Sequence, residues 1–360
     1  MSYWKSFWLA LFAASCLLAE AAGPAQAQYP PYATEWSDGK VVNLGGPPGY
    51  TEAMAMGIND AGQVVGFSHF AGSDLPTEWS GGSVINLGGL PGTTLGYAYG
   101  INNAGQVVGV SYSAQGAHAV EWTNGQVIDL AALTGSNDSS ASSINSAGQV
   151  VGWSYVGVTQ YATEWTGGSY LYLPGLPGAK ATDGAAINDH GEVVGTSLID
   201  STQYAVEWIG GKLIELGSAF TEASGINDAG TVVGASGFGD ALEWKDGSVI
   251  DLGGLPGATS SFAAAINNAG QVVGYSVVDG VTYATEWSDG SIINLGALPG
   301  TTYAAAASIN DAGQIVGASE FPPPPPPPPP PVSTPEPSTW AMMLLGFAGL
   351  GLAGYRLRSA

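Results

Sequence analysis

Histidines and carboxylates are the residue types in this chain that could do chemistry. The three histidines, His69, His118 and His190, differ in their spacing to the recurring Glu-Trp pairs, so no symmetric site uses them. Two carboxylates at a suitable distance could hydrolyse a glycosidic bond, but carboxylates are too numerous here for spacing to select a pair. The chain has no Cys/His cluster, phosphate-binding loop or nucleophile elbow. We therefore predict no catalytic residues, with a polysaccharide hydrolase or lyase as the enzymatic alternative.

The pair Glu-Trp occurs seven times and is the other candidate for chemistry. An aromatic side chain at one fixed point of a repeat buries a large area, which predicts packing anchors rather than sugar-stacking platforms. In a strand, the preceding glutamate faces the other way; we expect it to accept turn amides or face solvent, with a calcium ligand as the alternative. No Asp-x-Asp-x-Asp loop supports calcium, so no cofactor is predicted. The tryptophans are Trp36, Trp79, Trp122, Trp165, Trp208, Trp244 and Trp287.

The charge of the chain limits its partners. The net charge is −22, and the segment from Gln28 to Glu320 has four lysines and no arginine. Nucleic-acid affinity depends largely on Lys and Arg, so nucleic acid is excluded as a partner. The acidity is typical of a solubility device in an exported protein; loose binding of divalent cations is the alternative.

The Glu-Trp pairs must be positioned by a repeat, because five of the six gaps between them are 43 residues long. Within one period, β-type runs cover Ala53–Ile58, Val64–Phe67, Pro76–Trp79 and Val84–Leu87. The sequence Asn59–Gly62 is a turn, since Asn can bond its own backbone and Gly accepts positive φ. No sustained helical period occurs, so helices are not expected. The sequence predicts four short strands per repeat.

Seven repeats of four strands predict an all-β, seven-bladed β-propeller of four-stranded blades. Small residues precede each Ile-Asn, which places that strand innermost. The chain begins with an outer pair near Tyr32–Leu44 and ends with an inner pair near Ala304–Ser319. The two pairs are expected to complete one blade and so close the ring, removing exposed edges. A β-solenoid or open array is the alternative.

One gap between Glu-Trp pairs, from Trp208 to Trp244, is only 36 residues long. Four residues are missing around Gly217–Ala219 and three around Gly237–Gly239. Both deletions fall in inferred loops, which tolerate changes of length. We therefore expect all four strands of this repeat to be spared.

The two ends of the chain are not part of the repeat. Residues 1–27 are typical of a signal peptide, with Lys5, an apolar run and a cleavage site at Ala25–Ala27; an uncleaved anchor and a lipoprotein site at Cys16 are alternatives. The domain prediction is a signal peptide at 1–27, a seven-repeat propeller at 28–320, a proline-rich linker at 321–334 and a sorting tail at 335–360. The tail has an apolar stretch of the minimum length for a membrane span, followed by arginines.

Two resemblances follow from these motifs. Pro335, Glu336 and Pro337, followed by an apolar span and terminal arginines, resemble the PEP-CTERM sorting signal, which implies an exosortase-type processing enzyme and a Gram-negative bacterium that makes exopolysaccharide. Residues 32–319, with x-Ala-x-x-Trp, Val-Ile-Asn/Asp-Leu-Gly and Ile-Asn-x-x-Gly-x-Val-Val-Gly, resemble the HAF family of extracellular repeats. Only His118-Ala119-Val120 keeps its histidine. That family implies fold and location but no activity.

These observations predict a secreted protein of the cell surface or extracellular space, with a transient or permanent C-terminal membrane anchor. We expect it to act as a binding or scaffold protein, associated with an extracellular polysaccharide matrix. A lectin-like carbohydrate binder that uses several equivalent loops is the alternative within the binding class.

Overall fold

The computed structural model describes residues 31–93, 95–114 and 116–321. Contacts divide the chain into two units, Met1–Pro322 and Pro323–Ala360, and all described residues belong to the first. The expected signal peptide, most of the proline-rich linker and the sorting tail with its apolar span lie outside the described residues. Among the described residues, no helix is long and apolar enough to cross a membrane.

The all-β prediction is confirmed, because antiparallel strands dominate and each repeat supplies four of them. The first strands are β3 (Glu52–Ile58), β7 (Leu95–Ile101), β11 (Ser139–Ile144), β15 (Ala181–Ile187), β19 (Thr221–Ile226), β23 (Ala258–Ile266) and β27 (Tyr303–Ile309). The second strands are β4 (Val64–Phe70), β8 (Val107–Ser113), β12 (Val150–Val156), β16 (Val193–Ile199), β20 (Val232–Ser236), β24 (Val272–Val278) and β28 (Ile315–Glu320).

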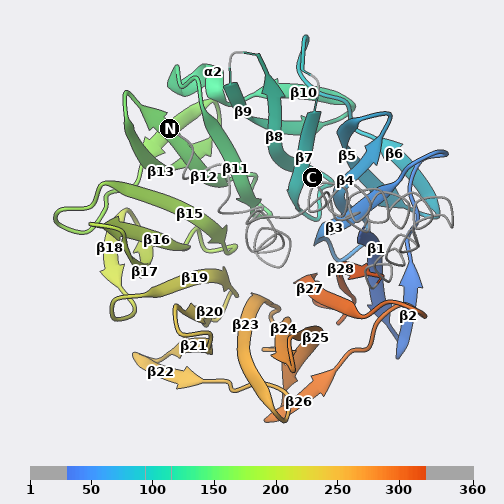
Figure 1. Cartoon of the computed structure of the whole chain (residues 1–360). Helices are drawn as coiled ribbons and strands as arrows, with labels where there is room; N and C mark the ends of the chain where they lie inside the picture. Colours follow the sequence, from blue (N-terminus) through green and yellow to red (C-terminus); the bar gives the residue numbers. More distant parts are fainter. Residues whose placement is uncertain (1–30, 94, 115, 322–360) are drawn as a thin grey trace, which may run out of the picture. The chain divides into compact units, whose positions relative to one another are not determined.

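The remaining strands carry the Glu-Trp pair and the outer edge. The third strands are β1 (Pro31–Ser37), β5 (Ser73–Ser80), β9 (Gly116–Thr123), β13 (Thr159–Thr166), β17 (Thr202–Ile209), β21 (Ala241–Lys245) and β25 (Val281–Ser288). The fourth strands are β2 (Lys40–Asn43), β6 (Ser83–Asn86), β10 (Gln126–Asp129), β14 (Ser169–Tyr172), β18 (Lys212–Glu215), β22 (Ser248–Asp251) and β26 (Ser291–Asn294). Figure 1 shows the sheets following one another around a common centre, with the first strands innermost.

The strands of each repeat pair in chain order, as in β3-β4-β5-β6. Two such sets, β11 to β14 and β15 to β18, are joined into a larger sheet by a single parallel pairing of Gln160 with Ala181. The remaining four-stranded sheet has the order β2-β1-β28-β27. In it β1 pairs antiparallel with β28, with Tyr32 opposite Ser319, so both ends of the repeat region contribute to one sheet.

Local chemistry explains the hairpin between the first and second strands. Asn59 Oδ1 accepts hydrogen bonds from the backbone N–H groups of Ala61 and Gln63, which closes the turn. The Val-Val-Gly sequence of the second strand needs its glycine, because a Cβ on Gly66 would lie 1.9 Å from the carbonyl oxygen of Met54. The first strand therefore approaches the second too closely for any side chain at this position.

The core lies between neighbouring sheets. Trp79 of β5 packs in one cluster with Ala55 of β3, and with Ala33 and Val316 of the adjacent sheet. All seven tryptophans of the Glu-Trp pairs are buried, with 1–5% of their surface exposed. Burying apolar side chains of this size stabilises each sheet-to-sheet contact.

Two local expectations were wrong. A four-residue helix, α2 (Ala131–Thr134), occupies the loop after β10, where Asp129 Oδ1 accepts the N–H of Ala132. The short repeat keeps all four strands, but its second deletion does not fall in a loop: β20 and β21 have five residues each, against seven and eight in most other repeats. The hairpin that joins β20 and β21 therefore loses its residues from the ends of both strands.

Candidate functional site: the central cavity

The seven first strands line one cavity of 270 Å³, here called the central cavity. Each strand contributes the residues that lead up to its isoleucine, so every repeat takes part. One end of the cavity is built from positions that recur in the repeats, and the other from positions that vary. The two ends therefore have different chemistry.

The recurring end is a cycle of asparagines that follow the first strands. Each asparagine Nδ2 donates to the backbone carbonyl of the next asparagine, at 3.0–3.1 Å, and Asn310 donates to Asn59. The side chains are 3–6% exposed. Because these amides are satisfied by the protein, the cycle is structural. Its members are Asn59, Asn102, Asn145, Asn188, Asn227, Asn267 and Asn310.

A second set of polar residues lies just outside the asparagine cycle. Asp60 Oδ1 accepts the backbone N–H of Asp311, and Asp228 Oδ1 accepts that of Asp189. Asn268 Nδ2 donates to carboxylate oxygens on both of its neighbours, Asp228 and Asp311. Among the described residues, no group of three or more His, Cys, Asp and Glu is arranged to hold a metal ion.

The glutamate of the Glu-Trp pair has a partner that the sequence interpretation missed. In five repeats it accepts a hydrogen bond from a glutamine that directly follows the turn, at 2.8–3.3 Å. One of these pairs is Gln149 Nε2 to Glu164 Oε1. The expectation of turn amides or solvent is therefore wrong in these repeats. The signal was the glutamine itself, which recurs 15 residues before four of these glutamates, whereas the fifth, Glu35, is paired with Gln314 near the other end of the repeat region.

The repeat with Glu207 breaks this pattern. Glu192 stands where five other repeats have glutamine, and its carboxylate accepts a hydrogen bond from Asn188 at 2.7 Å. Glu207 is only 8% exposed. Burial, and then the nearby charge of Glu192, raise the pKa of Glu207 above its ordinary value. Two carboxylates thus face each other where an amide and a carboxylate normally meet.

The other end of the central cavity carries side chains that differ between repeats. Tyr99 and Phe262 line the cavity together with small residues such as Ser142 and Ser224. Phe262 stacks on Tyr275 with ring centroids 5.5 Å apart. The residues four positions before the isoleucine have almost nothing in common: they are Met54, Tyr97, Ser140, Asp183, Glu222, Phe262 and Ala305.

Tyr97 is the centre of a polar and aromatic network at this end. Its hydroxyl donates to Asp74 Oδ2 at 2.5 Å, and Asp74 Oδ1 lies 2.6 Å from His69 Nδ1. Burial and the hydrogen bond to Asp74 raise the pKa of Tyr97, so this phenol stays protonated. Tyr99 and Tyr112 lie beside it, with ring centroids 6.2 and 6.0 Å away.

Two glutamates, Glu222 in β19 and Glu320 at the end of β28, have unusual acidity. Burial raises the pKa of Glu222 to about 7. Burial and the neighbouring Glu52 raise that of Glu320 to about 7 as well. Carboxyl groups that hold a proton near neutral pH can donate as well as accept hydrogen bonds. Burial also raises the pKa of Tyr275 to about 12, with Glu222 contributing.

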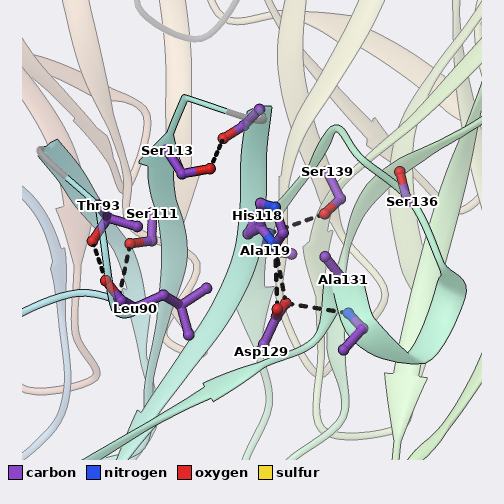
Figure 2. A network of polar contacts seen from close by, with 12 residues as sticks. Leu90, Thr93, Ser111, Ser113, His118, Ala119, Asp129, Ala131, Ser136 and Ser139 are labelled. Carbon is purple, nitrogen blue, oxygen red and sulfur yellow. Dashed lines mark hydrogen bonds and ion pairs between the residues drawn. The ribbon is translucent and has the colours of Figure 1, made fainter.

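The other two histidines do not join this network. His118 lies in β9, and its Nδ1 is 3.2 Å from Asp129 Oδ2, within the polar contacts that hold α2 and the loop after β10 (Figure 2). Ser139 Oγ accepts the backbone N–H of Ala119 in the same region. His190 is exposed, in the turn after β15. The three histidines therefore do not meet in one site.

The varied end of the central cavity could not be recognised from sequence motifs, because its residues form none. The available signal was departure from the repeat: aromatic and acidic residues replace small ones at a few first-strand positions. Of the site residues named from the sequence, the seven tryptophans lie in the core between sheets. Pro335, Glu336 and Pro337 lie outside the described residues.

Comparison with solved structures gives only distant likenesses. TolB from Acinetobacter baumannii has a TM-score of 0.44 and 12% identity over 62% of this chain and 61% of that one. A TolB from Agrobacterium tumefaciens has 0.48 and 12%, over 81% and 99%. An acylaminoacyl peptidase from Pyrococcus horikoshii has 0.49 and 12%, over 74% and 49%. The chain thus spans about three fifths of the first of these proteins and about half of the last. No curated protein matches the chain.

The C-terminal tail gives a specific match. Residues 333–359 match the PEP-CTERM protein-sorting motif, and this stretch includes Pro335, Glu336 and Pro337. The motif is a recognition signal for exosortase-type processing and indicates export to the cell surface or the extracellular space. The predicted PEP-CTERM signal is therefore confirmed, and with it the surface or extracellular destination.

Proposed function

We propose that the described unit is a closed seven-bladed β-propeller that binds polysaccharide outside the cell without cleaving it. Closure is supported by the asparagine cycle, in which the last asparagine bonds to the first, and by the pairing of β1 with β28. The sequence resemblance to HAF-type repeats is consistent with this architecture and with an extracellular location.

The observation that carries the binding role is the contrast between the two ends of the central cavity. At the recurring end the asparagine amides are used in the cycle, so the fold accounts for them. At the varied end Tyr99 and Phe262 reach the cavity wall. Phe262 stacks on Tyr275, and Glu222 is close enough to Tyr275 to contribute to its raised pKa. Flat aromatic faces next to groups that donate and accept hydrogen bonds suit the apolar and hydroxyl faces of a sugar ring.

The sorting motif identifies the compartment in which the ligand must be found. A protein sorted to the cell surface or beyond meets the polysaccharide matrix of its own cells first. The net charge of −22 disfavours strongly anionic chains. We therefore propose a neutral or weakly charged polysaccharide as the ligand, with the protein as a scaffold component of the matrix.

A glycan array with the purified chain, followed by calorimetry on any hit, tests this function. Tyr99→Ala should lower affinity for the ligand about tenfold or more, because the contact between a sugar ring and the cavity-lining Tyr99 ring is lost. His190→Ala, in an exposed turn at the recurring end, is the matched control and should bind like the parent chain. Absence of glycan binding, or equal loss in both variants, would contradict the proposal. Release of reducing ends from the producer's own polysaccharide would show that the protein is a hydrolase and not a binding protein that leaves the chain intact.

A further inference from the structure

The loop before β19 and the connection between β20 and β21, where the short repeat carries its two deletions, meet at one cavity. This cavity of 580 Å³, here called the socket, is lined by Leu216, Phe220, Phe238, Trp244 and other residues of β18 to β22 and their loops. Phe220 comes from the loop that leads into β19, and Phe238 from the hairpin between β20 and β21. Their rings lie 6.1 Å apart, and their exposed fractions are 51% and 80%.

Regular repeats show what normally fills this space. In the repeat of Figure 2, Leu90 packs against the cluster that contains Trp122. Its backbone N–H donates to Ser111 Oγ, and its carbonyl accepts the hydroxyl of Thr93. Trp122 Nε1 donates to the carbonyl oxygen of Gly88, which lies two residues before Leu90 in the loop, at 2.9 Å. A leucine in a tight turn therefore covers the tryptophan, and a backbone carbonyl satisfies the indole.

The same arrangement recurs in other repeats. Leu176 and Leu255 donate their N–H groups to equivalent serines. Trp208 and Trp287 donate to carbonyl oxygens of the loops that carry these leucines. The leucine turn is therefore a standard part of the repeat, which the 43-residue spacing maintains.

In the short repeat the leucine is replaced by Ser218. The correspondence follows from Thr221, whose hydroxyl donates to the carbonyl of Ser218 at 2.7 Å, as Thr93 does to Leu90 at 2.6 Å. Phe220 then occupies the position of Gly92 and keeps its positive φ, 65° against 83°. A bulky residue is strained in this region, so an exposed phenylalanine is held at the rim against its own backbone preference.

The hydrogen-bond partners of the leucine turn are also changed. Ser236, which corresponds to Ser111, donates to the carboxylate of Asp240 and accepts the N–H of Phe238. Trp244 is 4% exposed, and its Nε1 has no hydrogen-bond partner in the described part of the chain. A buried donor without an acceptor is costly, and this one belongs to a residue that lines the socket.

Trp165 makes a useful comparison, because its Nε1 also lacks a partner among the described residues. In the repeat of Trp165, the loop before β11 forms α2. The carbonyl of Ala131 in this helix accepts the N–H of Gly135 and does not bond to the indole. Ala131 is itself buried. A missing indole hydrogen bond alone therefore does not make a site; in the short repeat it coincides with a cavity and two exposed aromatic rings.

We propose that the socket is a docking site for a polypeptide turn of a partner protein. An aliphatic side chain of leucine size enters between Phe220, Phe238 and Leu216. A backbone carbonyl of the same turn accepts the Nε1–H of Trp244. The occupant is identified by the regular repeats, in which a leucine turn of this chain itself meets both requirements. Exposed Glu215 lines the socket, and exposed Asp240 accepts a hydrogen bond from Ser236 of its lining, so a lysine or arginine beside the turn would add attraction.

The test uses a synthetic peptide that copies the regular loop at residues 252–257, Leu-Gly-Gly-Leu-Pro-Gly, followed by lysine. Binding is followed in the full chain by the NMR signal of the Trp244 indole N–H, assigned with Trp244→Phe. We expect a saturable shift of this signal as its hydrogen becomes bonded. A peptide with its second leucine replaced by glycine should bind about tenfold or more weakly, because the buried side chain is lost.

Ser218→Leu restores the residue that fills the regular repeats and should reduce peptide affinity at least tenfold while the chain stays folded. Ser218→Thr, which remains small and polar, is the matched control and should keep the affinity of the parent. An unshifted indole signal at saturating peptide, or equal binding to Ser218→Leu and the parent, would overturn the proposal. A shift produced by oligosaccharide but not by the peptide would also overturn it. The socket lies outside the central cavity, so Tyr99→Ala should not affect peptide binding, and this separates the two proposals.

Discussion

Replacing Glu192 with glutamine should stabilise the protein in a pH-dependent way. In five repeats the equivalent position is a glutamine that donates to the glutamate of the Glu-Trp pair. Glu192→Gln would give Glu207 the same donor and remove a like charge. A hydrogen bond to a charged group contributes about 1.5–3 kcal/mol. Because Glu192 is only half-buried, we expect Glu192→Gln to raise the free energy of unfolding by about 1–2 kcal/mol at pH 8.

The sign of the pH dependence follows from Glu207. Its folded-state pKa is raised above the ordinary value of 4.5. The folded protein therefore binds more protons than the unfolded chain between these two pKa values, and stability falls as pH rises through this window. Below it, the protonated carboxyl of Glu207 can donate a hydrogen bond to Glu192, which replaces the bond that glutamine would donate in the opposite direction. The gain from Glu192→Gln should therefore be small at pH 4 and largest above pH 7.

Thermal unfolding at constant ionic strength and pH 4, 6 and 8 measures the effect. A gain of about 1–2 kcal/mol corresponds to a rise of about 2–3 °C in Tm for a unit of this size, because the unfolding entropy grows with chain length. Gln149→Glu is the matched control: it creates a second carboxylate pair with Glu164 and should lower Tm by a similar amount, again mainly above pH 7. A Tm change in Glu192→Gln that is equal at all three pH values would refute the reasoning.

Three further predictions concern stability. Asn145→Ala should cost about 2–4 kcal/mol, since it opens the asparagine cycle and leaves buried backbone groups without partners; Ser146→Ala, an exposed neighbour, should change Tm by less than about 1 °C. Trp122→Phe should cost about 1 kcal/mol more than Trp244→Phe, because only the indole of Trp122 has a hydrogen bond to lose; equal losses in chemical denaturation would contradict this difference. Glu320→Gln should remove a loss of stability between about pH 4.5 and 7, since the folded-state pKa of Glu320 is about 7; a wild-type Tm that does not fall in this window would show that the carboxyl is not desolvated.

The repeat pattern predicted strands well because each strand is specified locally, by alternating residues and Asn-x-x-Gly turns. The pairing partners of β1 and β28 were also predictable, because the chain starts with third and fourth strands and ends with first and second strands. Helix α2 was missed because one turn is too short to show a helical period. It forms where Asp129 can accept the N–H of Ala132.

The sites were less predictable than the fold. The partner of Glu164, which lies in β13, is Gln149, which directly precedes β12. Only the register between these two strands brings the side chains together. The socket depends on how the loop before β19 and the connection between β20 and β21 bend toward each other, which deletion lengths alone do not specify. The substitution of Ser218 for leucine was visible in the sequence, but its meaning required the hydrogen bond from Thr221.

The shared sheet β2-β1-β28-β27 has a consequence for biogenesis. Strand β1 must wait for its partner β28, which is synthesised some 280 residues later. Until then β1 has an unpaired edge and is open to aggregation or to proteases. The final assembly step is therefore tied to the synthesis of β27 and β28, so a chain interrupted before them stays incomplete whatever the intrinsic stability of its earlier sheets.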